Sequence, residues 1–244
     1  MSKGEDMQTG SFCPHPRAGE SCAGCNVRLI SVCAALEPEE LLTLEQMAQP
    51  AEFPARETLF LQGDDADSVY NITQGVARLY KLLPDGRRQI VGFALPGDFL
   101  GLAMRERYGF SADAVEPIVA CRFARTAYSA LVDEKPHLLR RLHEFATHEL
   151  TLAQDQMMLL GRRTAEEKVV SFLLLMRGRW AKLGRPSVTV PLPMSRQDIA
   201  DFLGLTIETV SRTFTKLAKD RTIVIVPDGV RLMNLERLES LAAA

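Results

Sequence analysis

The stretch SRQDIADFLGLTIETVSRTFTKLAKD, from Ser195 to Asp220, carries the densest local signals in the 244-residue chain. Ser195 followed by Asp198 has the form of a helix cap, in which side-chain oxygens accept from the first backbone N–H groups. Gly204 suits a tight turn, and Thr206 suits the start of a second helix. We therefore predict a helix-turn-helix in this stretch.

The second of these helices is predicted to have two contrasting faces. Its inward face comprises four apolar residues at intervals of three or four: Ile207, Val210, Phe214 and Leu217. Its opposite face is polar and comprises Glu208, Thr209, Ser211, Arg212 and Thr215. Guanidinium, carboxylate and hydroxyl groups are the donors and acceptors that read base edges in a major groove. An ordinary helical hairpin with a solvated charged face is the alternative.

The segments around this motif complete a winged helix. Residues 164–183 are predicted to form a helix with a capping box, made by Thr164 and Glu167. Residues 222–235 read as a strand, a turn at Asp228-Gly229 and a second strand. Residues 161–244 hold 14 Lys or Arg against 9 Asp or Glu, a net charge of +5, whereas the whole chain carries −2. We assign residues 162–244 to a domain with an anionic partner.

Residues 54–125 show a different pattern, of short apolar segments separated by turns. Four glycines recur at intervals of 12, 11 and 11 residues: Gly63, Gly75, Gly86 and Gly97. Pro84-Asp85-Gly86 is a strong hairpin turn. Regular strands at this spacing favour a small antiparallel barrel or roll. We assign residues 36–127 to this roll, after an N-terminal segment, residues 1–35, that is rich in cysteine.

The apolar residues change to helical spacing between Pro136 and Leu160, within a segment that we bound at residues 128–161. Two apolar rows lie side by side on this helix, more than the roll alone covers, which predicts dimerisation. The residues predicted at the dimer interface are Leu139, Leu142, Ala146, Leu150, Ala153, Asp155, Met157 and Leu160. The second row comprises Leu138, Phe145, Leu152 and Leu159. A helix buried in its own domain is the alternative.

Asp155 lies near the predicted seam, where two like charges facing each other would oppose association. Its replacement by Ala is therefore expected to strengthen self-association.

Three of the five cysteines lie within CAGCNVRLISVC, from Cys22 to Cys33. The chain shows neither a signal peptide nor an apolar run near the roughly 18 residues of a membrane span, so we expect a cytoplasmic protein. An odd number of cysteines in a reducing compartment leaves metal binding, redox chemistry or burial as their uses. The chain shows no nucleophile elbow and no phosphate-binding loop, so we do not expect an enzyme.

Three features, taken in order, resemble the CRP/FNR family of bacterial transcription regulators: the roll with GDFLG (97–101), the long helix, and IADFLGLTIETVSR (199–212). The resemblance runs from about Cys22 to Leu241. It implies an α+β protein, with an antiparallel β-roll like that of cyclic-nucleotide-binding domains, a long dimerisation helix and a C-terminal winged helix-turn-helix. It also implies a homodimer on an inverted repeat in double-stranded DNA.

Within the family, ETVSR resembles the E-x-x-S-R recognition helix of FNR-type members. The resemblance implies that Glu208, Ser211 and Arg212 read a TTGAT half-site. Weaker contacts to the DNA backbone are expected from Arg196, Thr206, Thr209, Thr215 and Lys216. The loop from Leu82 to Gln89 is a candidate contact for RNA polymerase.

FNR-type oxygen sensors hold a [4Fe-4S] cluster with three N-terminal cysteines and a fourth from the roll. The resemblance assigns this role to Cys22, Cys25, Cys33 and Cys121 and leaves Cys13 outside the set. The C-x2-C-x7-C spacing is similar to that of FnrL, FnrN and related regulators of alphaproteobacteria, and it departs from the enterobacterial C-x2-C-x5-C. The implied function is an anaerobic activator that is a dimer with its cluster and a weakly binding monomer after oxidation.

Other roles for the thiols stay open at this point. They could be structural or redox-active without a metal, or they could bind zinc. A further alternative is a family regulator that holds a small ligand in its roll. A cyclic nucleotide matches poorly, because Phe110 precedes Ser111 where the nucleotide-binding branch has an arginine before the hydroxyl residue.

Overall fold

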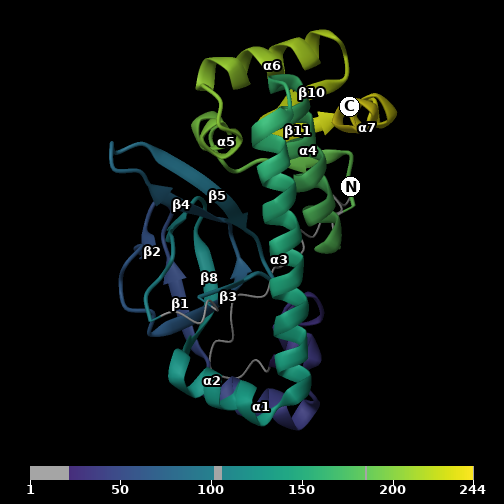
Figure 1. The fold of residues 1–244 in the computed structure, drawn as a ribbon. Coiled ribbons are helices and arrows are strands. Elements are labelled where there is room, and N and C mark those ends of the chain that lie inside the picture. The colour runs from purple at the N-terminus through teal and green to yellow at the C-terminus, as the bar shows by residue number, and fades with distance from the viewer. Residues whose placement is uncertain (1–21, 102–105, 185, 244) are drawn as a thin grey trace, which may run out of the picture.

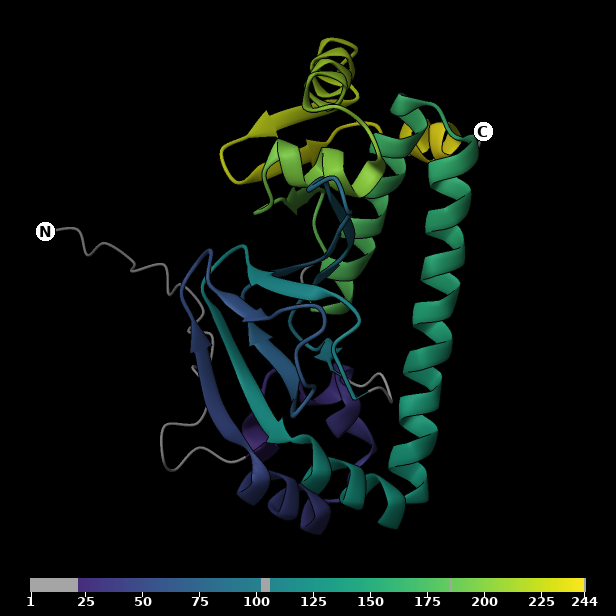
Figure 2. The same cartoon turned by 60° about the vertical axis from the view of Figure 1, so that its left-hand side comes forward.

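A computed structural model describes residues 22–101, 106–184 and 186–243. The long helix α3 (Pro136–Arg162) runs along the whole molecule, with the β-roll on one side of it and the DNA-binding domain at one end (Figures 1 and 2). Two shorter helices, α1 (Pro38–Met47) and α2 (Arg125–Glu134), lie together at the other end. None of the described helices is long and apolar enough to span a membrane.

The predicted antiparallel roll is confirmed as two four-stranded sheets, ordered β1-β8-β3-β6 and β2-β7-β4-β5. Its strands are β1 (Gln49–Phe53), β2 (Thr58–Phe60), β3 (Ser68–Gln74), β4 (Ala77–Leu82), β5 (Arg88–Ala94), β6 (Phe99–Leu100), β7 (Ser111–Ala114) and β8 (Ile118–Ala124). The predicted hairpin turn joins β4 to β5, with Gly86 at φ 83°. The interior is filled by side chains that include stacked Phe60 and Tyr108 rings, 3.9 Å apart.

The segment bounded at 128–161 is not one helix, which corrects the sequence prediction. It contains most of α2 and then α3, separated at Lys135, whose φ of −122° and ψ of 88° are not helical. Pro136 is the cause, because the ring of a proline disfavours helical geometry in the residue before it. The structure also adds α1 and three short 3-10 helices, η1 (Cys22–Gly24), η2 (Arg28–Ile30) and η3 (Val32–Ala35), which the sequence analysis did not predict.

The two apolar rows of α3 have different surroundings. In the second row, Leu138 is fully buried and Leu159 nearly so, both against the chain's own cores. In the row predicted for dimerisation, Leu139, Leu150 and Met157 remain 48%, 58% and 66% exposed. Ala146, Ala153 and Asp155 are exposed as well, while Leu142 and Leu160 are half-buried. Much of an apolar helix face is therefore left uncovered in the single chain.

The C-terminal domain has the predicted winged architecture. It consists of α4 (Ala165–Lys182), β9 (Thr189–Pro191), α5 (Arg196–Leu203), α6 (Ile207–Lys219), β10 (Ile223–Val226), β11 (Gly229–Leu232) and α7 (Leu235–Ala243). The wing is a three-stranded sheet, ordered β10-β11-β9, and the sequence analysis missed β9 and α7. Ile207 is 37% exposed, contrary to its predicted inward position. It occupies the first turn of α6, beyond the packed centre of the helix.

Gly229 corrects the predicted wing turn. The register pairs Val226 with Gly229, so Pro227 and Asp228 form the turn and Gly229 begins β11. A Cβ atom at Gly229 would lie 2.1 Å from the carbonyl oxygen of Val190. Glycine is required there because β9 and β11 approach closely, and not because of the turn.

An interdomain ion-pair network joins the β4–β5 hairpin of the roll to α5 of the DNA-binding domain. It consists of Arg78, Arg88, Asp113, Asp198 and Asp201. Asp198 accepts from Arg88 at 2.9 Å and from Arg78 at 3.2 Å. Arg78 also pairs with Asp113 at 2.9 Å, and Arg88 with Asp201 at 2.8 Å. Because these groups are largely buried, the network fixes the orientation of α5 relative to the roll.

Candidate DNA-reading helix and thiol site

The start of α6 is built by side-chain capping, as the sequence predicts. The Thr206 hydroxyl oxygen accepts from the Thr209 N–H at 3.2 Å. The preceding helix α5 begins with a reciprocal cap between Ser195 and Asp198 and ends at Gly204, whose φ of 61° is left-handed. Buried Val210, Phe214 and Leu217 hold α6 against the domain core. The pair of helices is therefore positioned by the chain's own contacts.

The three residues predicted to read bases share one open face of α6. Glu208, Ser211 and Arg212 are all exposed. Backbone N–H groups at the helix start, the Thr206 hydroxyl and the positive charge of Arg212 hold the pKa of Glu208 below its ordinary value. Glu208 therefore stays an acceptor over the physiological range, as bonding to a cytosine N4 group requires.

The residues predicted to contact the DNA backbone differ in availability. Thr209 is half-buried, and Thr206 and Thr215 already make local bonds within α6. Lys216 is exposed and pairs with Glu166 of α4, whose hydrogen bond and negative charge raise the pKa of the lysine. The Arg196 guanidinium lies 3.3 Å from the ring centroid of Phe214, and burial lowers the pKa of the arginine. Of these residues, Lys216 already has a charged partner, so a phosphate would compete with Glu166 for it.

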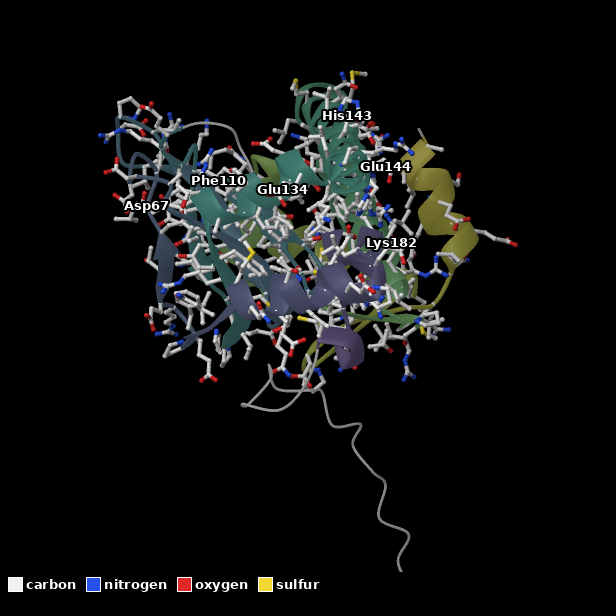
Figure 3. The ribbon with its side chains drawn as sticks, turned by 90° about the horizontal axis from the view of Figure 1, so that it is seen from below. Asp67, Phe110, Glu134, His143, Glu144 and Lys182 are labelled. Atoms are coloured by element: carbon white, nitrogen blue, oxygen red, sulfur yellow. The ribbon has the colours of Figure 1, made fainter. Side chains whose placement is uncertain are left out.

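The four cysteines assigned by the family pattern come from three elements. Cys22 begins η1, Cys25 follows it, Cys33 lies in η3, and Cys121 lies in β8. All four carry thiol groups. Cys33 and Cys121 share a buried core with residues of α1, α2 and α3, and Cys22 packs against that core. Figure 3 shows this end of the molecule from below. Cys13, which the family pattern leaves unassigned, lies outside the described residues.

These thiols lie within electrostatic range of one another. Burial and the negative charge of Cys33 raise the pKa of the Cys22 thiol to about 12. Burial raises the pKa of Cys121, and the charges of Cys33, Cys25 and Cys22 add to that effect. Burial also raises the pKa of Cys33. Such a group of thiols is hard to ionise without a cation among them.

The surroundings of the thiols fit an iron–sulfur cluster in donor chemistry. All the candidate ligands are sulfur, and the nearby Tyr128 hydroxyl is buried without a hydrogen-bond partner among the described residues. Among the described residues, no group of three or more Cys, His, Asp or Glu side chains is arranged to hold a single metal ion. A four-iron cluster takes one thiolate at each corner, so its ligands are more widely spaced than those around a single ion.

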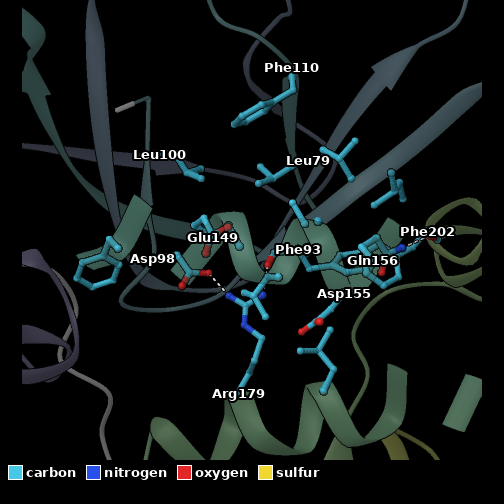
Figure 4. Close-up of a pocket in the computed structure, with 18 of the residues that line it drawn as sticks. Leu79, Phe93, Asp98, Leu100, Phe110, Glu149, Asp155, Gln156, Arg179 and Phe202 are labelled. Carbon is cyan, nitrogen blue, oxygen red and sulfur yellow. Dashed lines mark hydrogen bonds and ion pairs between the residues drawn. The ribbon is translucent and has the colours of Figure 1, made fainter. Parts of the chain in front are cut away.

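A second candidate site is a cavity of about 1280 Å³ between the roll, α3 and α4 (Figure 4). Leu79, Leu100 and Phe110 give it an apolar wall, and an ion pair between Asp98 and Arg179 lies inside it.

Ser111, the hydroxyl residue that follows Phe110, does not offer its oxygen to this cavity. Ser111 is 2% exposed, and its oxygen accepts from the Gln62 N–H at 2.9 Å.

Comparison with known proteins agrees with this architecture. Residues 50–135 match the family model of the cyclic nucleotide-binding domain, and residues 192–223 match that of bacterial regulatory proteins of the crp family. The transcriptional activatory protein AadR of Rhodopseudomonas palustris is 56% identical over 90% of this chain and 92% of its own length. The nitrogen fixation regulation protein FixK of Bradyrhizobium diazoefficiens is 53% identical over 93% and 95%.

A solved structure extends the comparison to three dimensions. FixK2 from Bradyrhizobium japonicum superimposes with a TM-score of 0.76 at 36% identity, covering 81% of this chain and 98% of its own. These relatives regulate transcription and are not enzymes, in agreement with the lack of catalytic motifs in the sequence. On sequence, architecture and domain order, the chain belongs to the CRP/FNR family of transcription regulators.

Proposed function

We propose that this protein is an oxygen-responsive regulator, and mainly an anaerobic activator, that holds a [4Fe-4S] cluster with Cys22, Cys25, Cys33 and Cys121. In this proposal the loaded protein is a cytoplasmic homodimer that binds a TTGAT-type inverted repeat in double-stranded DNA. The observation that carries the proposal is the convergence of four thiols, two of them buried and two half-buried, at the core that contains the start of α3.

The connection between the thiols and α3 is direct. Val32, Cys33 and Leu36 share a buried core with Leu138, the fully buried residue in the first turn of α3. Glu40 of α1 adds a polar tie, because it pairs with Lys135 at 3.2 Å and with His137 at 2.8 Å. An ordered thiol segment therefore supports the end of the helix that carries the predicted dimer face.

A bound [4Fe-4S] cluster would supply iron–sulfur bonds that oxygen breaks. In the protein, the loss of these bonds would make the segment that holds the cysteines less ordered. With the thiols no longer tied together, Val32 and Leu36 have only their apolar contacts to hold η3 against α3. Order–disorder changes of this kind are a common switching device. We expect a weaker dimer as the result.

Dimerisation matters because one α6 helix reads only one half-site. Regulators of this family act as homodimers on DNA. In our proposal the exposed row of α3, which includes Leu139, Leu150 and Met157, packs against the same row of a second copy. Asp155 belongs to this face and would limit the strength of the association. Two copies would then place Glu208, Ser211 and Arg212 on both half-sites.

RNA polymerase is the proposed partner for activation, through the β4–β5 turn. Arg88 and Gln89 at the end of the candidate loop already bind α5, which leaves Leu82 to Arg87 available to a partner. Replacing Asp85 and Arg87 is expected to reduce transcription without reducing DNA binding. Loss of both would contradict this contact.

The deciding experiment measures iron and acid-labile sulfide on the full chain purified without oxygen. We expect about four of each per chain, with bleaching in air and a shift from dimer to monomer. A colourless, iron-free protein that stays a dimer and still binds the TTGAT palindrome would discard the cluster and keep the regulator.

A family regulator that binds a small ligand in its roll is the second candidate. The cavity between the roll, α3 and α4 favours it, because ligand sites are usually concave and mostly apolar with a few polar groups, as this cavity is. Iron content separates the two candidates. Without iron, thermal stabilisation by added metabolites would be the next measurement.

A further inference from the structure

Buried polar atoms without partners are concentrated around the thiols. Among the described residues, the buried side-chain nitrogen and oxygen atoms that make no hydrogen bond belong to Arg28, Asn71, Tyr128 and Arg141. Arg28, Asn71 and Tyr128 adjoin the cysteines; the unpartnered atoms of Arg28 and Tyr128 are donors, whereas that of Asn71 is its amide oxygen, an acceptor. A buried polar atom with no partner costs free energy, so a group of them in one place indicates a missing binding partner.

Tyr128 is the clearest of these residues. It is 3% exposed, on α2, and its ring lies 5.1 Å from that of Phe99 and 5.7 Å from that of Phe123. Burial raises the pKa of its hydroxyl, and the negative charge of Cys33 adds to the effect. Phenylalanine would fill this aromatic site equally well. The hydroxyl therefore has no packing role and finds no acceptor among the described residues.

Asn71 and Arg28 approach the thiols from two other elements. The Asn71 side-chain amide, 1% exposed on β3, donates to the Cys33 sulfur at 3.8 Å. Asn71 also pairs with Cys121 in the register of β3 and β8. Arg28, in η2, is close enough for its positive charge to lower the pKa of Cys22 and Cys33. Donors from three elements thus surround one group of sulfur atoms.

We infer that Tyr128 is a positioning residue of the thiol site, whose hydroxyl donates to a sulfur of the group held by the four cysteines, with Asn71 as a second donor. This inference rests on the proposed function. Hydrogen bonds to the sulfurs stabilise the more negatively charged, reduced state of an iron–sulfur cluster. Removing one therefore makes the potential more negative and the cluster easier to oxidise. Tyr128 thus sets how readily the regulator responds to oxygen.

The test compares two changes of the same chemistry in the full chain. Tyr128→Phe removes the unpartnered hydroxyl. Tyr108→Phe removes a buried hydroxyl that donates to the Ser68 carbonyl oxygen at 2.7 Å, inside the roll core and away from the thiols. Both variants and the wild type are purified without oxygen. Iron content, midpoint potential and the rate of bleaching in air are measured for each, and the melting temperature is measured on the iron-free forms.

Tyr128→Phe is expected to keep its iron, to show a more negative potential, and to bleach about fivefold faster, the equilibrium factor that one net hydrogen bond represents. Its iron-free form should melt no lower than the wild type, because the lost hydroxyl had no partner. Tyr108→Phe should behave oppositely, with unchanged potential and bleaching rate but a lower melting temperature. Asn71→Leu is a second variant, expected to shift the potential in the same direction as Tyr128→Phe.

The iron measurement distinguishes failure of this inference from failure of the proposed function. A wild type that holds iron, with Tyr128→Phe and Asn71→Leu unchanged in potential and bleaching rate, overturns the inference and leaves the proposed function standing. A wild type purified without oxygen that holds no iron overturns both. An iron-free Tyr128→Phe that melts as far below the wild type as Tyr108→Phe also overturns the inference, since the hydroxyl would then have a partner within the chain.

Discussion

The DNA-reading region and the thiol region satisfy their polar groups in different ways. In the first, Ser195, Thr206 and Asp198 cap both helices, and Gly204 joins them. In the second, four thiols, two buried and two half-buried, repel one another when ionised, and the hydroxyl of Tyr128 has no partner among the described residues. The comparison teaches that the reading region satisfies its helix ends within a single chain, whereas the thiol region keeps a buried hydroxyl unpaired among the described residues, to which the bound group of our proposal would supply a partner.

The largest expected effect tests the thiol region. Cys121→Ser removes the candidate ligand that comes from the roll, and we expect iron to fall from about four per chain to almost none, because the three remaining ligands belong to one short segment. Cys13→Ser is the matched control and should retain its iron. Both are measured on protein purified without oxygen. Full iron in Cys121→Ser would exclude Cys121 as a ligand.

The next effect tests whether the reading region depends on the roll. Asp198→Ala removes the α5 cap and the partner shared by Arg78 and Arg88, leaving two cations with less compensation. We expect a loss of about 3 kcal/mol in the free energy of unfolding in urea. Asp201→Ala removes one acceptor from Arg88 and should cost about 1 kcal/mol. If Asp198→Ala and Asp201→Ala lost the same free energy of unfolding, the α5 cap and the second ion pair of Asp198 would contribute nothing to stability.

Base reading gives a smaller effect. Arg212→Ala should weaken binding to the TTGAT palindrome by about 2 kcal/mol for each half-site, because each subunit loses one base contact, while binding to random DNA changes little. Lys219→Ala, at an exposed position further along α6, should weaken both by the same factor. Binding isotherms on the two DNAs at fixed salt decide the matter. An equal loss on both DNAs for Arg212→Ala would assign this residue to the phosphates.

The smallest effect concerns Lys216. Glu166→Gln should release the lysine from its exposed ion pair and tighten binding to any DNA about twofold, since such pairs are weak. The slope of log affinity against log salt should become steeper, because each subunit displaces additional counterions from the DNA. Glu167→Gln, next in sequence but engaged in the Thr164 cap, is the control and should leave the slope unchanged. An unchanged slope for Glu166→Gln would remove Lys216 from the backbone contacts.

The features that sequence predicted well depend on short-range physics. Ser195, Gly204 and Thr206 mark helix ends because each acts on backbone groups within three or four residues. The glycine spacing likewise indicated the roll from residue 54 onward, but it missed β1, which precedes that residue, and the short strands β6 and β7. Local signals of this kind are visible in one sequence without an alignment.

The features that sequence missed are set by contacts between distant residues. Arg88 and Asp198 pair across 110 positions, and nothing near either residue indicates the partner. The two rows of α3 have the same periodicity, so only the packed structure shows that Leu138 is buried and Leu150 exposed. In the sequence Tyr128 cannot be distinguished from other aromatic core residues, and only the structure shows that its hydroxyl has no partner among the described residues.

The interdomain ion-pair network also determines how this regulator can be recombined with its relatives. Asp198 caps α5 and also pairs with Arg78 and Arg88 of the β4–β5 hairpin. The roll and the DNA-binding domain therefore share contacts across their boundary. Consider a chimera that takes residues 162–244 from one regulator and the roll from another. We expect it to keep the orientation of α6 only when Arg78 and Arg88 come from the same regulator as the DNA-binding domain. The transferable unit is therefore discontinuous in sequence: the winged helix together with one hairpin of the roll.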